Sequence, residues 1–282
     1  EIVVADSRQL YRLLDIGTDK SNQKELSIVP HHLINIINPD EEFSLARYQV
    51  LAYQAIKEIH QRSHLPILVG GSGMYVWSVL EGWGIPRISP DIKFRRSLEE
   101  EISKEGSEKL YENLKKIDSL AAQRIDQHNI RRVIRALEVH KNTDASLTRV
   151  HNKAPFFNMF IVGLTMDRKA LYHKIDLRVD DMIGQGLVIE VEKLINMGYK
   201  VNLPAMSGIG YRQIGMYLND EMSLTAAIQK IKYETHRFVR QQYNWFKLKD
   251  KRIKWFDVET EPENEIIMFI EKFFKTNSNL QD

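Results

Sequence analysis

The sequence predicts an α/β fold in which parallel strands alternate with helices. Three short apolar runs, residues 2–5, 65–69 and 160–164, lack alternating polar positions. Uninterrupted runs of this kind are typical of parallel strands that are covered on both faces. Helical periodicity separates the first two runs and returns after the third, and this strand–helix order is the pattern of α/β proteins.

The helices are predicted from their spacing and their first residues. Ser44 can cap the helix after the first strand, because a serine hydroxyl accepts hydrogen bonds from free amides at a helix start. The helix over residues 73–82 follows two glycines, and residues 171–197 and 223–248 are predicted to be helical, the latter capped by Ser223. The inward positions expected for the first two helices are Leu45, Tyr48, Leu51, Ala55 and Ile59, and Tyr75, Val79 and Leu80.

The segment from residue 83 to residue 150 interrupts this rhythm, because it is highly charged and carries no strand pattern. We therefore predict three parts: a first part of the α/β core (1–82), a helical insertion (83–150) and a second part of the core (151–282). Basic residues predominate from 229 to 254 and acidic residues after 255. A basic block beside an acidic tail indicates a polyanionic partner, although a solvated helix face is the more ordinary explanation.

Composition excludes several classes of function. The chain has 282 residues, a formal net charge of +2 and no cysteine, so a disulfide framework, a thiolate zinc site, an iron–sulfur cluster and a cysteine nucleophile are excluded. No apolar run is long enough for a transmembrane helix, and we expect a cytoplasmic protein without membrane contact. Glu1 stands directly before an apolar strand, from which we expect that the native N-terminus is missing.

Two polar turns directly follow predicted strands. Asp6-Ser7-Arg8-Gln9 follows the first, and ligands of parallel sheets bind at the carboxyl ends of strands, where a carboxylate can take part in proton or metal chemistry. Capping of the next turn by Asp6 is an equally good explanation. Gly70-Gly71-Ser72-Gly73 follows the second strand and permits close backbone approach, but Met74 and Tyr75 replace the Lys and Ser/Thr of a phosphate-binding loop. A tight turn explains it equally well.

Two other motifs indicate binding of an anion or a base. Arg131 and Arg135 share one helix face, and arginine prefers phosphate and carboxylate ligands; ion pairing with Glu138 is the alternative. The turn at residues 207–212 ends in Tyr211 and Arg212, an aromatic and a guanidinium that suit a nucleobase or a phosphate.

Other side chains suggest no ligand. His31 and His32 are not expected to bind a metal, because adjacent residues rarely ligate one ion. Tyr243, Trp245 and Phe246 are expected to pack the last long helix.

These residues together resemble the tRNA dimethylallyltransferase (tRNA isopentenyltransferase) family over nearly the whole chain. The matching order and spacing are far more specific than any single motif. The resemblance is carried by Ala5-Asp6-Ser7-Arg8-Gln9-Leu10-Tyr11, Asp15-Ile16-Gly17-Thr18, Pro30-His31-His32-Leu33-Ile34, Phe43-Ser44, Pro66-Ile67-Leu68-Val69-Gly70-Gly71-Ser72-Gly73-Met74-Tyr75, Arg135-Ala136-Leu137-Glu138-Val139, Gly208-Ile209-Gly210-Tyr211-Arg212 and Trp255-Phe256-Asp257.

The resemblance implies a P-loop-type parallel-sheet core with a helical insertion that holds the anticodon stem-loop of tRNA. It implies transfer of a dimethylallyl group from dimethylallyl diphosphate to N6 of adenosine-37, assisted by Mg²⁺. The nucleotide-binding P-loop of the family, which precedes the Asp6 motif by one helix, is expected to be missing here, and the chain is expected to be inactive or severely impaired. A monomer is expected.

Roles carry over only to matching positions. Asp6 matches the general base and Arg178 an arginine that grips the diphosphate. The positions that match tRNA contacts are Asp6, Ser7, Arg8, Gln9, Ser72, Arg95, Arg131, Arg132, Val133, Ile134, Arg135, Ser207, Gly208, Ile209, Gly210, Tyr211 and Arg212. No metal ligand is identified.

The chain departs from the family pattern in places. Gln127-His128-Asn129 stands where Pro-Asn-Asp is frequent, which changes the local geometry, and Ser72 stands where Thr is common.

Three other functions compete with this prediction. An adenylate isopentenyltransferase acts on a free nucleotide and needs no arginine-bearing helical insertion. A non-catalytic RNA-binding relative needs no carboxylate at a strand end. A P-loop kinase transfers phosphate from ATP to a small substrate.

Overall fold

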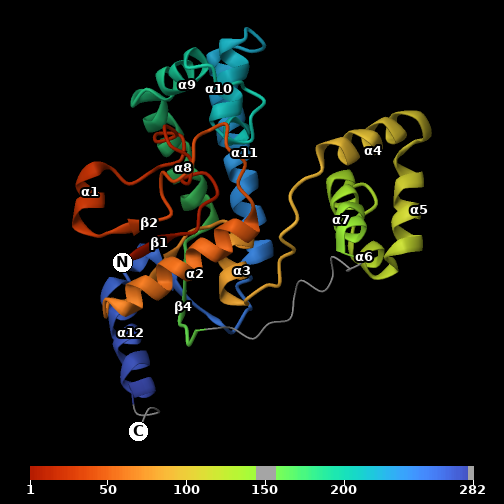
Figure 1. The fold of residues 1–282 in the computed structure, drawn as a ribbon. Coiled ribbons are helices and arrows are strands. Elements are labelled where there is room, and N and C mark those ends of the chain that lie inside the picture. Colours follow the sequence, from red (N-terminus) through yellow and green to blue (C-terminus); the bar gives the residue numbers. More distant parts are fainter. Residues whose placement is uncertain (144–156, 279–282) are drawn as a thin grey trace. The chain divides into compact units, whose positions relative to one another are not determined.

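The computed structural model describes residues 1–143 and 157–278, which divide into two compact units (Figure 1). The first unit combines Glu1–Val76 with Phe157–Asp282, and the second is Trp77–Phe156. Each unit is described by itself below. Within the described ranges, no helix combines the length and the apolar character needed to cross a bilayer.

A three-stranded parallel sheet forms one half of the first unit. Its order is β2-β1-β3, with β1 at Ile2–Val4, β2 at His31–His32 and β3 at Ile67–Val69. Ile2 of β1 pairs with His31 on one side and with Ile67 on the other. Because both pairs are parallel, the carboxyl ends of the three strands lie at one edge of the sheet. Helix α1 (Gln23–Ile28) precedes β2.

Helix α2 (Leu45–Gln61) packs on β1, and three of the five positions predicted to face inward, Tyr48, Ala55 and Ile59, are buried. The Ser44 hydroxyl accepts a hydrogen bond from the Arg47 amide, which confirms the predicted cap. The Tyr48 hydroxyl donates to the Val4 carbonyl oxygen at 3.1 Å, and the Tyr48 ring stacks on Tyr75 of helix α3 (Gly73–Leu80) at 4.0 Å. Leu45 and Leu51 are only half-buried, because the buried stripe runs through Tyr48, Ala52, Ala55, Ile56 and Ile59.

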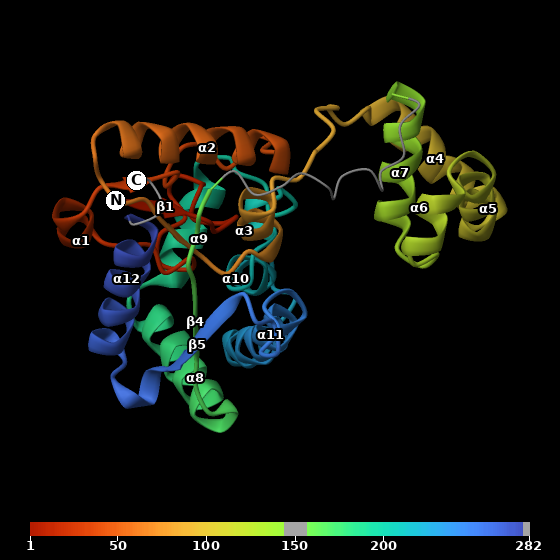
Figure 2. The same cartoon turned by 90° about the horizontal axis from the view of Figure 1, so that it is seen from below.

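A second, two-stranded parallel sheet pairs β4 (Ile161–Thr165) with β5 (Ile253–Asp257). Figure 2 shows these strands between helices α12 and α11. The Phe269 ring of α12 packs with the rings of Phe160 and Phe256. The Tyr243 ring of α11 packs with that of Trp255, with 6.5 Å between the ring centroids. Aromatic side chains therefore cover both faces of this sheet. The remaining elements of this half are α8 (Arg168–Gly184), α9 (Leu187–Asn196), η2 (Ala205–Ser207), α10 (Tyr211–Leu218), α11 (Leu224–Trp245), η3 (Val258–Thr260) and α12 (Glu263–Ser278).

The α/β class is confirmed, but three details of the prediction are wrong. The strands form two small sheets, and Ile67 and Val69, which share one face of β3, are 47% and 48% exposed, so β3 is not covered on both faces. The predicted helix over 171–197 is two helices, because Gly186 takes a left-handed conformation with φ +102° between α8 and α9. Strands β2 and β5 were not predicted, because β2 has only two residues and Lys254 interrupts the apolar run of β5.

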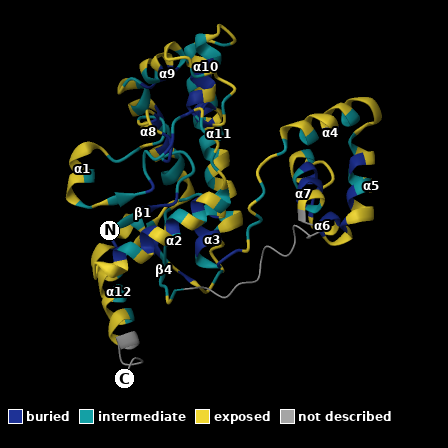
Figure 3. Cartoon of the chain, viewed as in Figure 1, coloured by how far each residue is buried: buried dark blue, intermediate teal, exposed yellow. Residues whose placement is uncertain are grey.

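The second unit contains helices around its own apolar core (Figure 3). Helix α4 (Ile92–Glu105), α5 (Ser107–Ile117), α6 (Ser119–Arg124) and α7 (Ile130–Thr143) follow one another. Residues 144–150 of the predicted insertion lie outside the described part of the chain. The core of this unit consists of Leu98, Leu110, Leu114, Ala121, Ala122, Ile125, Val133, Ile134, Ala136 and Leu137.

We expect Gly70→Ala to destabilise the first unit. A Cβ at Gly70 would lie 2.2 Å from the carbonyl oxygen of Ala5, and neither backbone segment can move without disturbing the β1–β3 pair. Overpacking of this kind costs about 1–3 kcal/mol. The midpoint of thermal unfolding, followed by circular dichroism, measures it. Gly184→Ala is the matched control, because nothing lies within 4 Å of its Cβ position, and an equal loss in both variants would contradict the prediction.

Candidate active site

Two turns meet at the carboxyl edge of the three-stranded sheet. Asp6 and Ser7 leave β1, and residues 70–73 leave β3. The Ser7 amide donates to the Ser72 hydroxyl oxygen at 3.1 Å, and the Ser72 amide donates to the Ala5 carbonyl oxygen at 3.3 Å. The strand register therefore brings Asp6 beside the glycine turn, as expected for parallel strands.

The two oxygens of the Asp6 carboxylate differ in their hydrogen bonding to the described residues. Oδ1 accepts hydrogen bonds from the amides of Arg8 at 2.7 Å and Gln9 at 3.4 Å, so Asp6 does cap the following turn. None of the described residues donates a hydrogen bond to Oδ2. The side chain is half-buried, and its negative charge, after burial itself, helps to raise the pKa of both Tyr48 and Tyr75. Capping and proton acceptance are thus compatible, one on each oxygen.

Side chains of helix α11 lie close to the glycine turn at residues 70–73. The Gln242 side-chain amide donates to the Gly71 carbonyl oxygen at 3.2 Å. A Cβ at Gly71 would lie 2.2 Å from Gln242 Nε2, and one at Gly73 would lie 2.2 Å from the Trp245 ring. Gly71 and Gly73 are therefore needed for packing against α11, so the close approach that these glycines permit is made by side chains of the protein itself. The Trp245 ring lies against Gly73, but 37% of the residue is exposed, so it is only partly packed.

Arg8 binds a second turn of the same unit. Its guanidinium donates to the carbonyl oxygens of Pro204 at 2.5 Å and Ala205 at 3.5 Å, and to the Ser207 hydroxyl at 3.3 Å. The Ser207 hydroxyl in turn donates to the Pro204 carbonyl oxygen at 2.7 Å. Arg8 thus fastens η2, and with it residues 207–212, to the turn that carries Asp6.

Gln9 is held by a loop that lies further along the chain. Its side-chain Nε2 donates to the carbonyl oxygens of Thr18 at 3.0 Å and Asp19 at 3.2 Å. Two carbonyl acceptors fix the orientation of the amide, because only the nitrogen can donate. In the described part of the chain, nothing donates to Oε1, so Gln9 offers an acceptor to a ligand.

The loop at residues 15–18 wraps around a carboxylate that sequence reasoning missed. Oε2 of Glu190 in α9 accepts hydrogen bonds from the amides of Asp15 at 3.1 Å and Ile16 at 2.9 Å, and Oε1 accepts from the Gly17 amide at 3.3 Å. Successive amides that converge on an anion form a nest. We call residues 15–18 the nest loop.

Lys20 binds the first residue of the nest loop, Asp15. Its ammonium donates at 2.7 Å to the Tyr11 carbonyl oxygen, to Asp15 Oδ1 and to Asn35 Oδ1. Burial lowers the pKa of Lys20, and the hydrogen bond to Asp15 opposes this effect.

Tyr211 is part of the core and cannot stack on a nucleobase, which corrects that prediction. Its side chain is 1% exposed, and its hydroxyl donates to Glu190 Oε1 at 2.5 Å. Burial raises the pKa of Tyr211, as does the Glu190 charge. The ring lies against Gly17, where a Cβ would be 2.4 Å from Tyr211 Cε2. Arg212 forms an ion pair with Glu234 of α11.

Arg178 lies beside the same loop. Its guanidinium is 3.3 Å from Asp19 Oδ2, and the two side chains are 50% and 67% exposed. An ion pair this open to solvent contributes less than about 1 kcal/mol, so water or another anion can replace Asp19 at low cost.

In the helical unit, two of the predicted RNA-binding arginines hold a buried carboxylate. Arg95 donates to both oxygens of Glu138 at 2.9 Å, and Arg135 donates to Glu138 Oε2 at 2.5 Å and to the Ile88 carbonyl oxygen at 3.0 Å. The Asp91 amide donates to Glu138 Oε1 at 2.7 Å. The alternative of ion pairing with Glu138 is therefore confirmed for Arg135.

The other residues of this helix divide between core and surface. Val133 and Ile134 belong to the core of the unit, so the prediction that they contact tRNA is wrong for their side chains. Arg131 and Arg132 are exposed.

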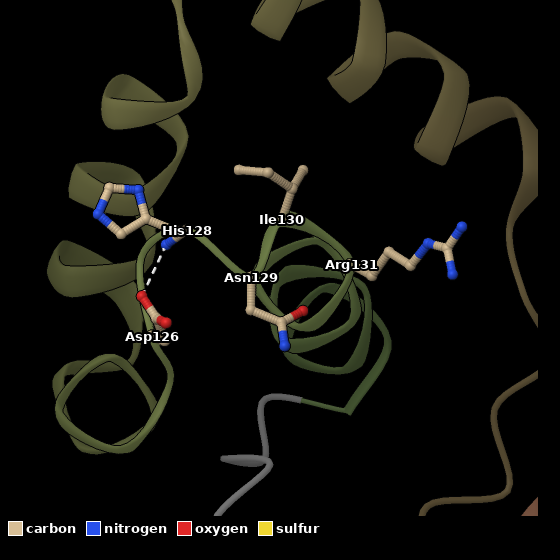
Figure 4. Close-up of a pocket in the computed structure, with 5 residues that line it drawn as sticks. All are labelled: Asp126, His128, Asn129, Ile130 and Arg131. Atoms are coloured by element: carbon tan, nitrogen blue, oxygen red, sulfur yellow. Dashed lines mark hydrogen bonds between the residues drawn. The ribbon is translucent and has the colours of Figure 1, made fainter. Parts of the chain in front are cut away.

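Residues at the start of α7 line an open depression of about 450 Å³ (Figure 4). Asn129 Oδ1 accepts a hydrogen bond from the Arg132 amide at 3.3 Å and Asp126 Oδ1 accepts from the His128 amide at 2.9 Å, so both side chains hold the turn before the helix. Figure 4 shows the Arg131 side chain directed away from Asp126 and His128. The unusual Gln127-His128-Asn129 sequence therefore still provides a cap for α7.

The histidine pair has structural partners. His32 Nε2 lies 2.6 Å from Glu1 Oε2, and His31 Nδ1 lies 2.7 Å from the Val29 carbonyl oxygen. Within residues 1–143 and 157–278, no cluster of three His, Cys, Asp or Glu side chains is arranged to hold a metal ion.

Comparisons with known proteins give one consistent result. The family model described as IPP transferase matches residues 9–249. The tRNA dimethylallyltransferase of Dehalococcoides mccartyi is 48% identical over 96% of this chain and 84% of its own length, and that of Thermomicrobium roseum is 46% identical over 93% and 79%. The full-length tRNA isopentenylpyrophosphate transferase of Bacillus halodurans is 38% identical, with a TM-score of 0.72 over 100% of this chain and 90% of that one.

A eukaryotic dimethylallyltransferase acting on tRNA has a TM-score of 0.80 at 23% identity, over 98% of this chain and 73% of that one, which shows the shared fold. The shares of length covered in the bacterial relatives do not support the expectation of a severely impaired fragment. The expectation of a missing P-loop segment stays a prediction.

Proposed function

The chain belongs to the IPP transferase family, and we propose that it transfers a dimethylallyl group from dimethylallyl diphosphate to N6 of adenosine-37 in tRNA. Its relatives bear the name of that activity. The observation that carries the proposal is Asp6 at the end of β1, with Oδ1 held by two backbone amides and Oδ2 without a donor among the described residues. A carboxylate fixed in this way can accept a proton without losing its position.

In the proposed reaction, N6 of adenine attacks the first carbon of the dimethylallyl group. The C–N bond forms as the C–O bond to diphosphate breaks, and diphosphate leaves with the bonding electron pair. The amino group then loses one proton, which passes to Oδ2 of Asp6. The adenine lone pair is delocalised into the ring, so removal of this proton favours the product.

We propose that Arg178 binds the diphosphate. Its present partner, Asp19, is exposed and weakly held, so diphosphate oxygens can replace the carboxylate. We also propose that Mg²⁺ neutralises the charge of the leaving diphosphate. Mg²⁺ is commonly held by substrate phosphates together with one or two carboxylates. The absence of a three-ligand cluster among the described residues is compatible with that mode of binding.

We propose that tRNA contacts both units. The target adenine must leave its stack, which costs a few kcal/mol and is easiest in a loop. Exposed Arg131 and Arg132 suit contacts to backbone phosphates. Near Asp6, the proposed tRNA contacts come from the Asp6 turn, the glycine turn and the turn that Arg8 binds. They are Ser7, Arg8, Gln9, Ser72, Ser207, Gly208, Ile209, Gly210 and Arg212. We further propose a monomer that works in the cytoplasm.

Labelled dimethylallyl diphosphate with Mg²⁺ tests the proposal. The acceptors are an anticodon stem-loop with adenosine at position 37, and free AMP. Both are incubated with the chain as it is and with the chain joined to an amino-terminal segment that carries the P-loop expected from the family resemblance. We expect label in the stem-loop and none in AMP. Label in AMP would identify an adenylate isopentenyltransferase, and stem-loop binding without label in either form of the chain would identify a non-catalytic RNA-binding relative.

A further inference from the structure

Glu190 connects two parts of the chain that are far apart in sequence. It lies on α9, and its carboxylate accepts from three amides of the nest loop and from the Tyr211 hydroxyl. Four donors around one carboxylate can be satisfied only by an acceptor that carries two oxygens and a negative charge. A glutamine in its place would turn an N–H group toward backbone N–H groups, so the loop could not keep this conformation.

The conformation of the nest loop determines what Gln9 can offer to a ligand. The loop and its next residue place the Thr18 and Asp19 carbonyl oxygens against Gln9 Nε2, which leaves Oε1 as an acceptor. Adenine presents an amino group at the position where inosine presents a carbonyl oxygen. An acceptor held in place can bind an amino hydrogen, whereas it repels a carbonyl oxygen.

The same loop adjoins the proposed diphosphate site. Asp19 directly follows the nest loop and pairs with Arg178 at 3.3 Å. The end of the nest loop is thus linked to both side chains, because Gln9 binds the Thr18 and Asp19 carbonyl oxygens and Arg178 pairs with the Asp19 carboxylate. Among the described residues, Glu190 forms its hydrogen bonds with the nest loop and Tyr211 and not with Gln9 or Arg178.

We propose that Glu190 is a positioning residue that, together with Tyr211, folds the nest loop so that Gln9 selects a base with an exocyclic amino group. The proposal rests on the proposed function, because it takes an RNA base as the ligand of Gln9. It adds a determinant of base selectivity that lies on α9, outside the turn that carries Asp6.

Glu190→Gln tests the proposal, with Glu192→Gln as the matched control. Glu192 lies on the same helix and is exposed, so both variants lose one charge from α9 but only one disturbs the nest loop. The first readout is hydrogen exchange in the full chain, resolved to the amides of residues 15–17. We expect these amides to exchange faster in Glu190→Gln and unchanged in Glu192→Gln.

The second readout is the ratio of dissociation constants for two stem-loops, with adenosine or inosine at position 37. We expect the unaltered chain to favour adenosine by about tenfold, the size of one well-placed hydrogen bond to a base. Glu190→Gln should bring the ratio close to one, while Glu192→Gln keeps it. Gln9→Ala should remove the preference too, and the double variant should lose no more than either single variant, because both act on one contact.

The outcomes separate this inference from the proposed function. Unchanged preference for adenosine in Glu190→Gln, or equal affinity of the unaltered chain for both stem-loops, would overturn the inference. Absence of transfer with the preference intact would contradict the proposed chemistry alone. Should Glu190→Gln fail to fold, Tyr211→Phe removes only one of the four donors and should lower the preference in part; an unchanged ratio there would also overturn the proposal.

Discussion

Asp6→Asn is expected to lower the rate of dimethylallyl transfer by about 100- to 10,000-fold, the usual contribution of a positioned general base. The substitution leaves the fold of the turn intact. Asparagine keeps the Oδ1 acceptor that holds the amides of Arg8 and Gln9, and it removes only the basicity of the second oxygen. The rate is measured in a single turnover with labelled dimethylallyl diphosphate and an adenosine-37 stem-loop, using whichever form of the chain transfers label.

Asp6→Ala is the companion variant, because it removes the base and the cap together. Loss of a cap of this kind costs about 1 kcal/mol of stability, so this variant should unfold at a lower temperature while Asp6→Asn should not. Stem-loop affinity should change little in Asp6→Asn, since Oδ1 and the turn persist. A full transfer rate in Asp6→Asn would exclude Asp6 as the proton acceptor.

Much of the local structure could be predicted because its cause is local. Ser44 and Ser223 both cap the helices that their spacing indicates, since a cap depends only on the next three residues. The meeting of Asp6 with the glycine turn could also be predicted. Parallel strands end at one edge of a sheet whatever else surrounds them.

The parts that could not be predicted depend on long-range partners. Tyr211 matches a site motif in sequence, yet its ring fills the space beneath Gly17, a residue nearly 200 positions earlier in the chain. Arg95 and Arg135 both satisfy a single buried carboxylate, Glu138, which a charge pattern alone does not reveal for Arg95.

Glu190 could have been found from a signal within its own helix. The buried residues of α9 are Leu187, Val191 and Leu194, and Glu190 stands on the same face, three residues after the first of them. An acidic residue on the buried face of an amphipathic helix needs a hydrogen-bonding partner elsewhere. The sequence shows that need but not which amides would meet it.

Glu138→Ala is expected to destabilise the helical unit by about 3 kcal/mol, the lower part of the range for removal of one partner from a buried ion pair. The Glu138 side chain has no exposed surface, while those of Arg95 and Arg135 are 37% and 28% exposed, so both guanidinium groups can regain some hydration. The Asp91 amide would lose its acceptor as well. Hydrogen exchange of the α7 amides in the full chain measures the effect on this unit alone.

Glu112→Ala is the matched control in the same unit. Glu112 pairs with Lys115 three residues later, and both side chains are about half exposed. Removal of an exposed pair of this kind changes stability by less than about 1 kcal/mol. Similar exchange rates in the two variants would show that the buried charge cluster does not hold α7 in place.

The stability contributed by Glu138 should also disappear in acid. Burial of the carboxyl raises its pKa, but hydrogen bonds from Arg95, Arg135 and the Asp91 amide outweigh that effect and lower the pKa to about 2. Because the pKa is lower in the folded state, the contribution is complete above the ordinary value of 4.5 and is lost as the pH falls from there toward 2. The excess protection of α7 over the Glu138→Ala variant should therefore shrink across that interval, and an excess that stays constant from pH 5 to about pH 2 would mean that the carboxylate charge does not stabilise this unit.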